Sequence, residues 1–176
     1  MSRSTSTRLS KMDEVEINGW RIYLHPCFLD QYEALLAEVE TAKARDSENY
    51  RRRACTKMLA AVHRLAFETI PGDPARPEYR LGDTLGKQHR HWFRAKFFQQ
   101  YRLFFRFQES ARIIVIAWVN DDGSKRAYGS KTDAYAVFAK MLARKRPPDG
   151  WNALLAECLK AERRSATVRS AAKDAV

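Results

Sequence analysis

Hydrophobic and polar residues alternate near the start of the chain and then change to a helical spacing. Residues 17–24 alternate with a period of two, which predicts a short first strand. Residues 28–45 and 50–65 repeat apolar positions at the spacing of an amphipathic helix. Because the connection between these two segments is short, they are expected to pack as an antiparallel helical hairpin.

A proline-rich segment at residues 71–77 ends the helical pattern, and alternation follows it. Residues 92–98, 101–107 and 112–119 predict three strands joined by short turns. The last of these is apolar on both faces, so it is expected to be the central strand of the sheet. Two helices are then expected, a first one capped by Thr132 and a short second one that begins near Trp151.

The chain has 176 residues, of which 45% are hydrophobic, and this fits one globular domain. We place that domain at residues 13–162, between flexible tails at residues 1–12 and 163–176. The longest apolar run, at residues 113–119, is far shorter than the roughly 18 residues that span a bilayer, so no membrane segment is expected. The three cysteines lack a CxxC spacing and are expected to be free thiols in the cytoplasm.

The chain is strongly basic, with 32 Lys and Arg against 21 Asp and Glu, a formal charge of +11 and a pI near 9.8. This charge predicts a polyanionic partner. Much of the positive charge lies between residues 87 and 131, a segment with ten basic and three acidic residues. The ten are Lys87, Arg90, Arg94, Lys96, Arg102, Arg106, Arg112, Lys125, Arg126 and Lys131.

Several of these cations share a face of the predicted sheet. Arg94 lies on one face with Lys96, and Arg102 shares a face with Arg106 on the next strand, since side chains alternate along a strand. Aromatic residues expected on this face are Trp92, Phe98 and Phe104. Interleaved aromatic and basic residues favour binding of single-stranded RNA, whereas charge pattern alone is also typical of a solvated sheet face.

The loop at residues 125–131 follows the predicted central strand. We expect its Arg126 and Tyr128 to converge with Arg102 and Lys96 on one phosphate, although a solubilising loop would show the same composition. The residues expected to contact RNA around this centre are Lys87, Arg90, Trp92, Phe104, Arg106, Lys125 and Lys131.

The histidines give little support for a metal centre. His89 and His91 form the one close pair, and no acidic residue lies near them in the sequence, so neither metal nor cofactor is expected. His91 stays open as a general acid or base. The chain also lacks a glycine-rich phosphate loop and a serine nucleophile elbow, which argues against nucleotide hydrolysis and acyl transfer.

Several longer segments point to a known family. They are residues 18–20, 25–28, 92–97, 101–106, 118–121, 128–135 and 144–151. Together they resemble the YhaV toxins of bacterial type II toxin–antitoxin systems, within the wider RelE/ParE-like group. The resemblance covers about residues 17–155.

The resemblance implies an α+β fold of the RelE type, with a helical hairpin packed on a twisted antiparallel sheet of about four strands and with C-terminal helices. It also implies an endoribonuclease, an mRNA interferase that cleaves mRNA by metal-independent attack of the RNA 2′-OH, on translating ribosomes. A non-catalytic RNA-binding or ribosome-binding inhibitor of translation is the alternative, and a DNA-directed protein is a second one.

The resemblance also implies roles for particular residues and a partner. Arg94, Lys96, Arg102, Arg126 and Tyr128 match the basic and tyrosine positions of the group's catalytic site. The arginines would stabilise the phosphate in the transition state, and Lys96 or Tyr128 would transfer protons. The expected partners are mRNA, the ribosome and a cognate antitoxin resembling the AbrB-like PrlF type, which would cover the basic face.

Overall fold

The computed structural model of the protein describes residues 14–176, and the expected tail at residues 1–12 lies outside the described part. The strands are β1 (Val15–Ile17), β2 (Trp20–Leu24), β3 (Phe93–Phe97), β4 (Tyr101–Gln108) and β5 (Ile113–Val119). The helices are α1 (Pro26–Arg45), α2 (Ala54–Arg64), α3 (Ile70–Gly72), α4 (Ala134–Ala143), α5 (Trp151–Lys160) and α6 (Glu162–Ala175). Short helical turns are η1 (Tyr50–Arg52), η2 (Leu65–Thr69), η3 (Pro77–Tyr79), η4 (Lys87–His89) and η5 (Asp122–Ser124).

The α+β class, the helical hairpin and the three-strand meander are confirmed. Within residues 14–176 the strands form a five-stranded sheet in the order β1-β2-β5-β4-β3, so β5 is the central strand, as expected. The sheet is mixed and not fully antiparallel, because β2 pairs in parallel with β5. Parallel pairing is possible here because the helical hairpin forms a long crossover between β2 and the meander.

The predicted first strand at residues 17–24 is in fact a hairpin. Asn18 and Gly19 both have positive φ values, 52° and 78°, and they turn the chain between β1 and β2. An Asn-Gly pair is the preferred sequence for such a two-residue turn, since both positions need positive φ. The turn adds the edge strand β1, which the prediction of a single strand did not include.

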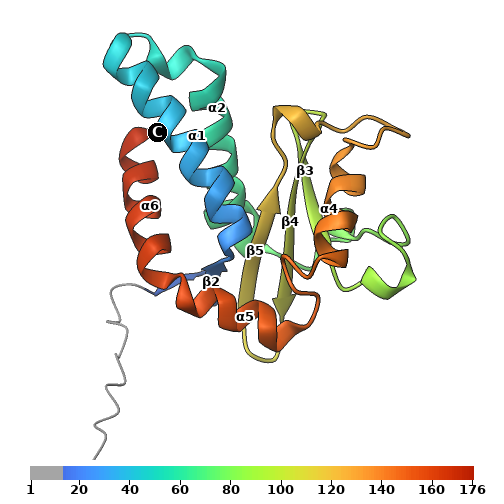
Figure 1. Ribbon diagram of the computed structural model, residues 1–176. Coiled ribbons are helices and arrows are strands. Elements are labelled where there is room, and N and C mark those ends of the chain that lie inside the picture. Colours follow the sequence, from blue (N-terminus) through green and yellow to red (C-terminus); the bar gives the residue numbers. More distant parts are fainter. Residues whose placement is uncertain (1–13) are drawn as a thin grey trace, which may run out of the picture.

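Helices cover both faces of the sheet (Figure 1). On one face α1, α2 and α6 enclose an apolar core that contains Leu103 and Phe105 of β4. On the other face α4 and α5 enclose a second core, in which Phe104 of β4 meets Phe138 of α4. Alternation along β4 therefore sends successive side chains into two different cores.

Residues 163–176 are not the flexible tail that their composition predicts, because they form most of α6. Val168, Ala172 and Ala175 are buried against α1 and α2, and the hydroxyl of Tyr50 donates to the carbonyl of Ala175 at 3.3 Å. The apolar stripe of α6 consists mainly of small residues, so the segment has the polar composition of a solvated chain. The sequence therefore gives little sign of its hydrophobic face.

Candidate nucleic-acid cleavage site

The pairing of β3 with β4 gathers three cations on the α4 side of the sheet. Lys96 pairs with Arg102, and Arg94 pairs with Phe104. Phe104 points into the core beneath α4, so Arg94, Lys96 and Arg102 share its face. The shared face predicted for Arg94 and Lys96 is thus present, and the register adds Arg102 to it.

The hydroxyl of Tyr135, in the first turn of α4, lies between two of these cations. Arg94 Nε donates to it at 2.9 Å and Arg102 Nε at 3.1 Å. Arg126 stacks on the same aromatic ring, with its guanidinium carbon 4.9 Å from the ring centroid. Three arginines from β3, β4 and the loop before α4 therefore meet around one side chain.

The loop that contains Arg126 is anchored at both ends. The backbone N–H of Arg126 donates to the carbonyl of Gln100 at 2.9 Å, which fastens the loop to the turn between β3 and β4. Arg126 Nη1 also donates to Asp133 at 2.5 Å, and Asp133 accepts from the N–H of Ala127 and caps α4 through the N–H of Tyr135. The predicted N-cap, Thr132, is therefore wrong by one residue.

The turn between β3 and β4 is strained. Phe98 and Gln99 both have positive φ, 44° and 62°, at positions that usually require Gly or Asn. In this conformation the carbonyl of Gln99 accepts from Arg102 Nη1 at 2.9 Å, and the next carbonyl holds the Arg126 loop. The strained turn thus positions two of the three arginines.

Arg94 and Arg102 have no carboxylate partner among the ion pairs of residues 14–176, although Arg102 is only 7% exposed. Their hydrogen bonds go to Tyr135 and to backbone carbonyls, through Nε and Nη1. Among residues 14–176, every fully buried side-chain nitrogen has a hydrogen-bond partner. A nitrogen without a partner is therefore at least partly accessible to solvent. Nη2 of each arginine therefore has no protein partner among the described residues, and a phosphate oxygen is the kind of acceptor that suits a guanidinium N–H at this position.

Comparison with known proteins places the chain in a family. A family model described as a toxin with endonuclease activity, of a toxin–antitoxin system, matches residues 22–159. The chain belongs to the YhaV toxin family. The ribonuclease toxin YhaV of Escherichia coli (strain K12) is 50% identical over 143 residues, which are 80% of this chain and 93% of the relative. Toxin YhaV of Escherichia coli O6:H1 is 49% identical over the same length. No solved structure matches the chain.

As a YhaV-family member, the protein is a toxin with endonuclease activity and has a cognate antitoxin. The matched residues run from β2 to α5, so they include Arg94, Arg102, Arg126 and Tyr135. They leave out β1 and α6, which complete the sheet edge and the first core. None of the helices in the described residues has the length and apolar character needed to cross a bilayer.

Two residues expected to stack on RNA bases are not available to do so. Trp92 and Phe104 are both 0% exposed, because they pack against Phe138 of α4 with ring centroids 5.1 and 4.1 Å away. The sequence predicts that this face of the sheet is accessible to RNA, but in the structure α4 covers it. Arg106 is also partly buried, between the rings of Trp92 and Trp151, and burial lowers the pKa of its guanidinium.

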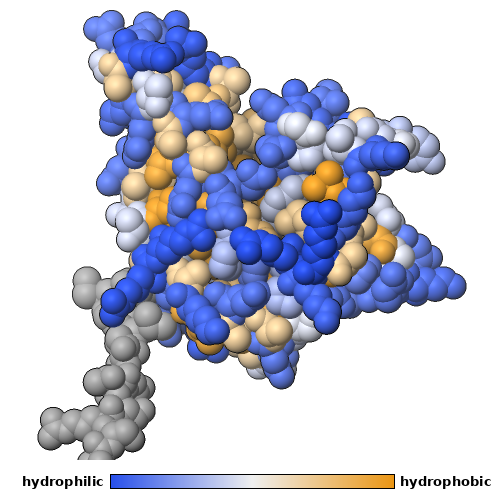
Figure 2. All heavy atoms as spheres, viewed as in Figure 1, coloured by the Kyte–Doolittle hydropathy of each residue, from blue (hydrophilic) through white to orange (hydrophobic). Residues whose placement is uncertain are grey.

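The remaining predicted RNA contacts lie at the surface. Lys87, Lys96, Lys125 and Lys131 are exposed, and Arg90 forms an ion pair with Asp83 at 2.6 Å. Tyr128 is 95% exposed and lies beneath Arg126, whose guanidinium carbon is 5.6 Å from the ring centroid. Figure 2 shows hydrophilic residues over most of the viewed face, with hydrophobic atoms in separate patches.

Three residues that hydrogen-bond to the arginines are not among the site residues predicted from the sequence. Tyr135 lies among the apolar residues of α4, so its hydroxyl gives no separate signal in the sequence. Asp133 was overlooked beside Thr132, although Asp is a preferred N-cap. Asn120 directly follows the apolar run of β5, and this change from apolar to polar is the one feature of the sequence that marks any of the three residues. Its amide accepts from the N–H of Arg102 at 2.7 Å and donates to the carbonyls of Gln100 and Ser124.

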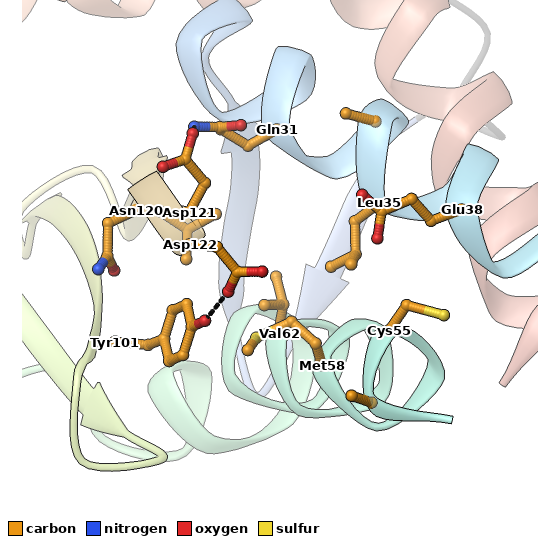
Figure 3. Close-up of a pocket in the computed structure, with 13 residues that line it drawn as sticks. Gln31, Leu35, Glu38, Cys55, Met58, Val62, Tyr101, Asn120, Asp121 and Asp122 are labelled. Atoms are coloured by element: carbon orange, nitrogen blue, oxygen red, sulfur yellow. Dashed lines mark hydrogen bonds between the residues drawn. The ribbon is translucent and has the colours of Figure 1, made fainter. Parts of the chain in front are cut away.

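Tyr101 precedes Arg102 but points away from the arginines. Its ring faces a cavity between α1, α2 and the end of β5, where its hydroxyl donates to Asp122 (Figure 3). Burial, together with the hydrogen bond to Asp122, raises the pKa of Tyr101, so its hydroxyl stays protonated at neutral pH. Tyr101 and Arg102 are adjacent in the sequence, but their side chains lie on opposite sides of the sheet.

Proposed function

We propose that this toxin is an mRNA interferase, an endoribonuclease that holds one RNA phosphate among Arg94, Arg102 and Arg126. The observation that supports this most strongly is the contact of Arg94 and Arg102 with a single neutral oxygen, that of Tyr135. Two neighbouring guanidinium groups without a carboxylate among the described ion pairs are costly in isolation, and a bound phosphate offsets that cost. The relative from strain K12 is named a ribonuclease toxin, which agrees with an RNA substrate.

The chemistry requires no group that the chain lacks. The 2′ oxygen of RNA attacks the adjacent phosphorus, the bond from phosphorus to the 5′ oxygen breaks, and the products are a 2′,3′-cyclic phosphate and a 5′-OH. Nη2 of Arg94 and of Arg102, together with Arg126, stabilises the negative charge that builds on the phosphate oxygens. Lys96, which pairs with Arg102 on the neighbouring strand, or Tyr128 beneath Arg126 transfers the protons.

RNA approaches along the exposed cations around this centre. Lys87, Lys125 and Lys131 neutralise backbone phosphates on either side of the scissile one. Phe98 is 54% exposed at the tip of the β3–β4 turn, and Tyr128 is exposed in the neighbouring loop. These two rings take the base-stacking role that burial denies to Trp92 and Phe104.

The substrate in the cell is mRNA on translating ribosomes, so the toxin inhibits translation and growth from the cytoplasm. The formal charge of +11 supports this, since the ribosome is a large polyanion. The cognate antitoxin is of the AbrB-like PrlF type and covers the basic face around Arg102 with acidic groups. Covering that face competes directly with RNA binding.

Product chemistry tests the proposal. Purified protein is incubated with a defined RNA, and with the same RNA containing a single 2′-deoxynucleotide at the position cut. We expect 2′,3′-cyclic phosphate and 5′-OH ends from the first RNA and no cleavage of the second at that position. Ends with a 5′-phosphate, or cleavage of the deoxy-substituted site, would rule out attack by the 2′-OH.

Mapping of RNA 5′ ends after induction in a bacterial host tests the cellular role. New ends inside coding regions support an mRNA interferase. Growth arrest without new ends would favour a non-catalytic inhibitor bound to RNA or the ribosome, and cleavage of DNA with intact RNA would favour a DNA-directed toxin.

A further inference from the structure

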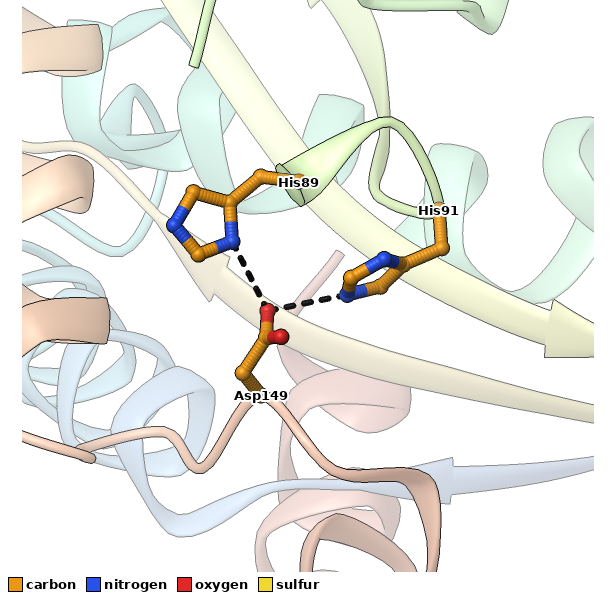
Figure 4. Close-up of side chains that lie close together, drawn as sticks. All are labelled: His89, His91 and Asp149. Atoms are coloured by element: carbon orange, nitrogen blue, oxygen red, sulfur yellow. Dashed lines mark hydrogen bonds and ion pairs between the residues drawn. The ribbon is translucent and has the colours of Figure 1, made fainter. Parts of the chain in front are cut away.

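A second cluster of reactive side chains lies apart from the three arginines. His89 ends η4, His91 precedes β3, and Asp149 lies in the loop between α4 and α5. His89 Nδ1 and His91 Nε2 each lie 2.9 Å from Oδ1 of Asp149, and the two rings point at that oxygen from one turn (Figure 4). The fold therefore supplies the acidic residue that the sequence around the histidines lacks.

Further contacts hold the carboxylate of Asp149 in this position. Trp92 Nε1 donates to the same Oδ1 at 2.8 Å, and Arg106 Nη1 donates to the backbone carbonyl of Asp149 at 2.5 Å. Arg106 is in turn held between the rings of Trp92 and Trp151. Outer groups of this kind orient metal-binding side chains and increase metal affinity.

We propose that His89, His91 and Asp149 bind one zinc ion. Two imidazole nitrogens and a carboxylate oxygen are a donor set that suits Zn²⁺. Their ligand atoms all lie within 4.8 Å of one another, so small movements bring each to the ~2.0–2.2 Å that zinc requires. The ion binds Nδ1 of His89 and Nε2 of His91, and each neutral ring then has its proton on its other nitrogen.

The exposure of the cluster gives the ion access to solvent. The side chains of His89, His91 and Asp149 are 18%, 37% and 40% exposed. An ion can therefore enter without unfolding of the chain, and water completes the tetrahedral coordination as the fourth ligand.

The bound ion joins two segments that lie far apart in the sequence, the turn before β3 and the loop before α5. Trp92, next to His91, packs on Phe138 at 5.1 Å, and Phe138 stacks on Phe104 at 4.1 Å. Phe104 contacts the ring of Tyr135 with a centroid distance of 5.8 Å. Zinc therefore stabilises the layer on which α4 and Tyr135 rest, and its role is separate from the chemical step proposed for the arginines.

Metal titration tests the site directly. The full chain, purified without a histidine tag and stripped with a chelator, is titrated with ZnCl₂ by calorimetry, and with Co²⁺ to record its visible absorption. We expect one ion per chain with a micromolar or lower Kd, a tetrahedral Co²⁺ spectrum, and a higher melting temperature with zinc. His89→Gln and His91→Gln should each weaken binding at least tenfold, whereas Gln88→Ala, an exposed change in the same turn, should not.

The histidine variants are decisive because Asp149 also accepts a hydrogen bond from the buried Trp92, so its replacement is expected to lower stability as well as metal binding. Circular dichroism of the zinc-free variants checks that they are folded. The proposal is overturned if folded wild-type protein binds no zinc at about a hundredfold excess over a micromolar Kd, or if both histidine variants bind it as tightly as the wild type. The second result would assign the ion to other groups, such as the thiol of Cys55.

Discussion

Arg94 and Arg102 donate from their Nε atoms to the same phenolic oxygen, that of Tyr135, at 2.9 and 3.1 Å. The oxygen fixes the direction of both guanidinium groups but does not neutralise their charge. In the proposed mechanism, Tyr135 positions both arginines, and a bound RNA phosphate supplies the missing negative charge.

Replacement of Tyr135 by Phe should separate positioning from packing. The ring keeps its contact with Phe104, while both arginines lose their shared acceptor. We expect cleavage to fall about 10- to 100-fold, because misplaced groups stabilise the transition state poorly. The unfolding free energy should fall by only about 1 kcal/mol.

The matched control is Tyr79→Phe, which removes a hydroxyl from the core on the other side of the sheet. Single-turnover cleavage and denaturant unfolding of both variants make the measurement. An equal loss of cleavage in the two variants would contradict a positioning role for Tyr135.

Asp133 should make stability depend on pH in the acidic range. Burial opposes ionisation of its carboxyl, but hydrogen bonds from Ala127, Arg126 and Tyr135 outweigh it and lower the pKa. A lowered pKa in the folded state adds stability that is present above the unfolded pKa of about 3.9 and is lost as the pH falls through the folded value.

Asp133→Asn keeps an oxygen at the N-cap but removes the charge. We expect the variant to lose about 1 kcal/mol at neutral pH and to show a shallower decline in unfolding free energy below about pH 4. Asp174→Asn, at an exposed position near the end of α6, is the control. Urea unfolding across this range checks the prediction, and parallel curves for wild type and Asp133→Asn would contradict it.

Tyr128 should matter for RNA and not for folding. Its side chain is 95% exposed, so Tyr128→Ala should leave the melting temperature unchanged. Loss of a stacked base should weaken single-stranded RNA binding by about 1–3 kcal/mol. Binding is measured with an uncleavable 2′-deoxy-substituted strand, and unchanged affinity would remove Tyr128 from the RNA path.

Val168 tests whether α6 belongs to the folded domain. It is 5% exposed in the core shared with α1 and α2, so Val168→Ala should lower the unfolding free energy by about 1–2 kcal/mol. Thr167→Ala, one residue earlier and exposed, should have little effect. Denaturant midpoints compare the two, and equal midpoints would indicate that the helix does not pack as described.

Periodicity predicted most of the architecture because the helices and the meander have long, regular patterns. The run of β5, apolar on both faces, correctly identified the central strand. Helix α6 is difficult to predict because its buried stripe contains mainly small residues such as alanine. The β1–β2 hairpin has a turn sequence at Asn18-Gly19, but the alternation on either side of it also fits a single strand.

The candidate site was only partly visible in the sequence. Strand periodicity predicted that Arg94 and Lys96 share one face of β3, whereas the register that places Arg102 beside Lys96 could be read only from the structure. Periodicity could not show that α4 covers that face, since a helix distant in the sequence supplies Phe138 and Tyr135. The sequence therefore predicts a binding surface at Trp92 and Phe104, whereas in the structure both residues belong to the core beneath α4.

The rate of RNA cleavage by Arg102→Ala decides whether the arginine cluster is the cleavage site. Single-turnover rates are compared with the wild type and with Arg163→Ala, which removes the same charge from an exposed position on α6. If Arg102 stabilises the transition state, its loss should slow cleavage by about 10²- to 10³-fold, while Arg163→Ala stays within about twofold of wild type. A folded Arg102→Ala protein that cleaves at the wild-type rate would contradict a role for Arg102 in transition-state stabilisation.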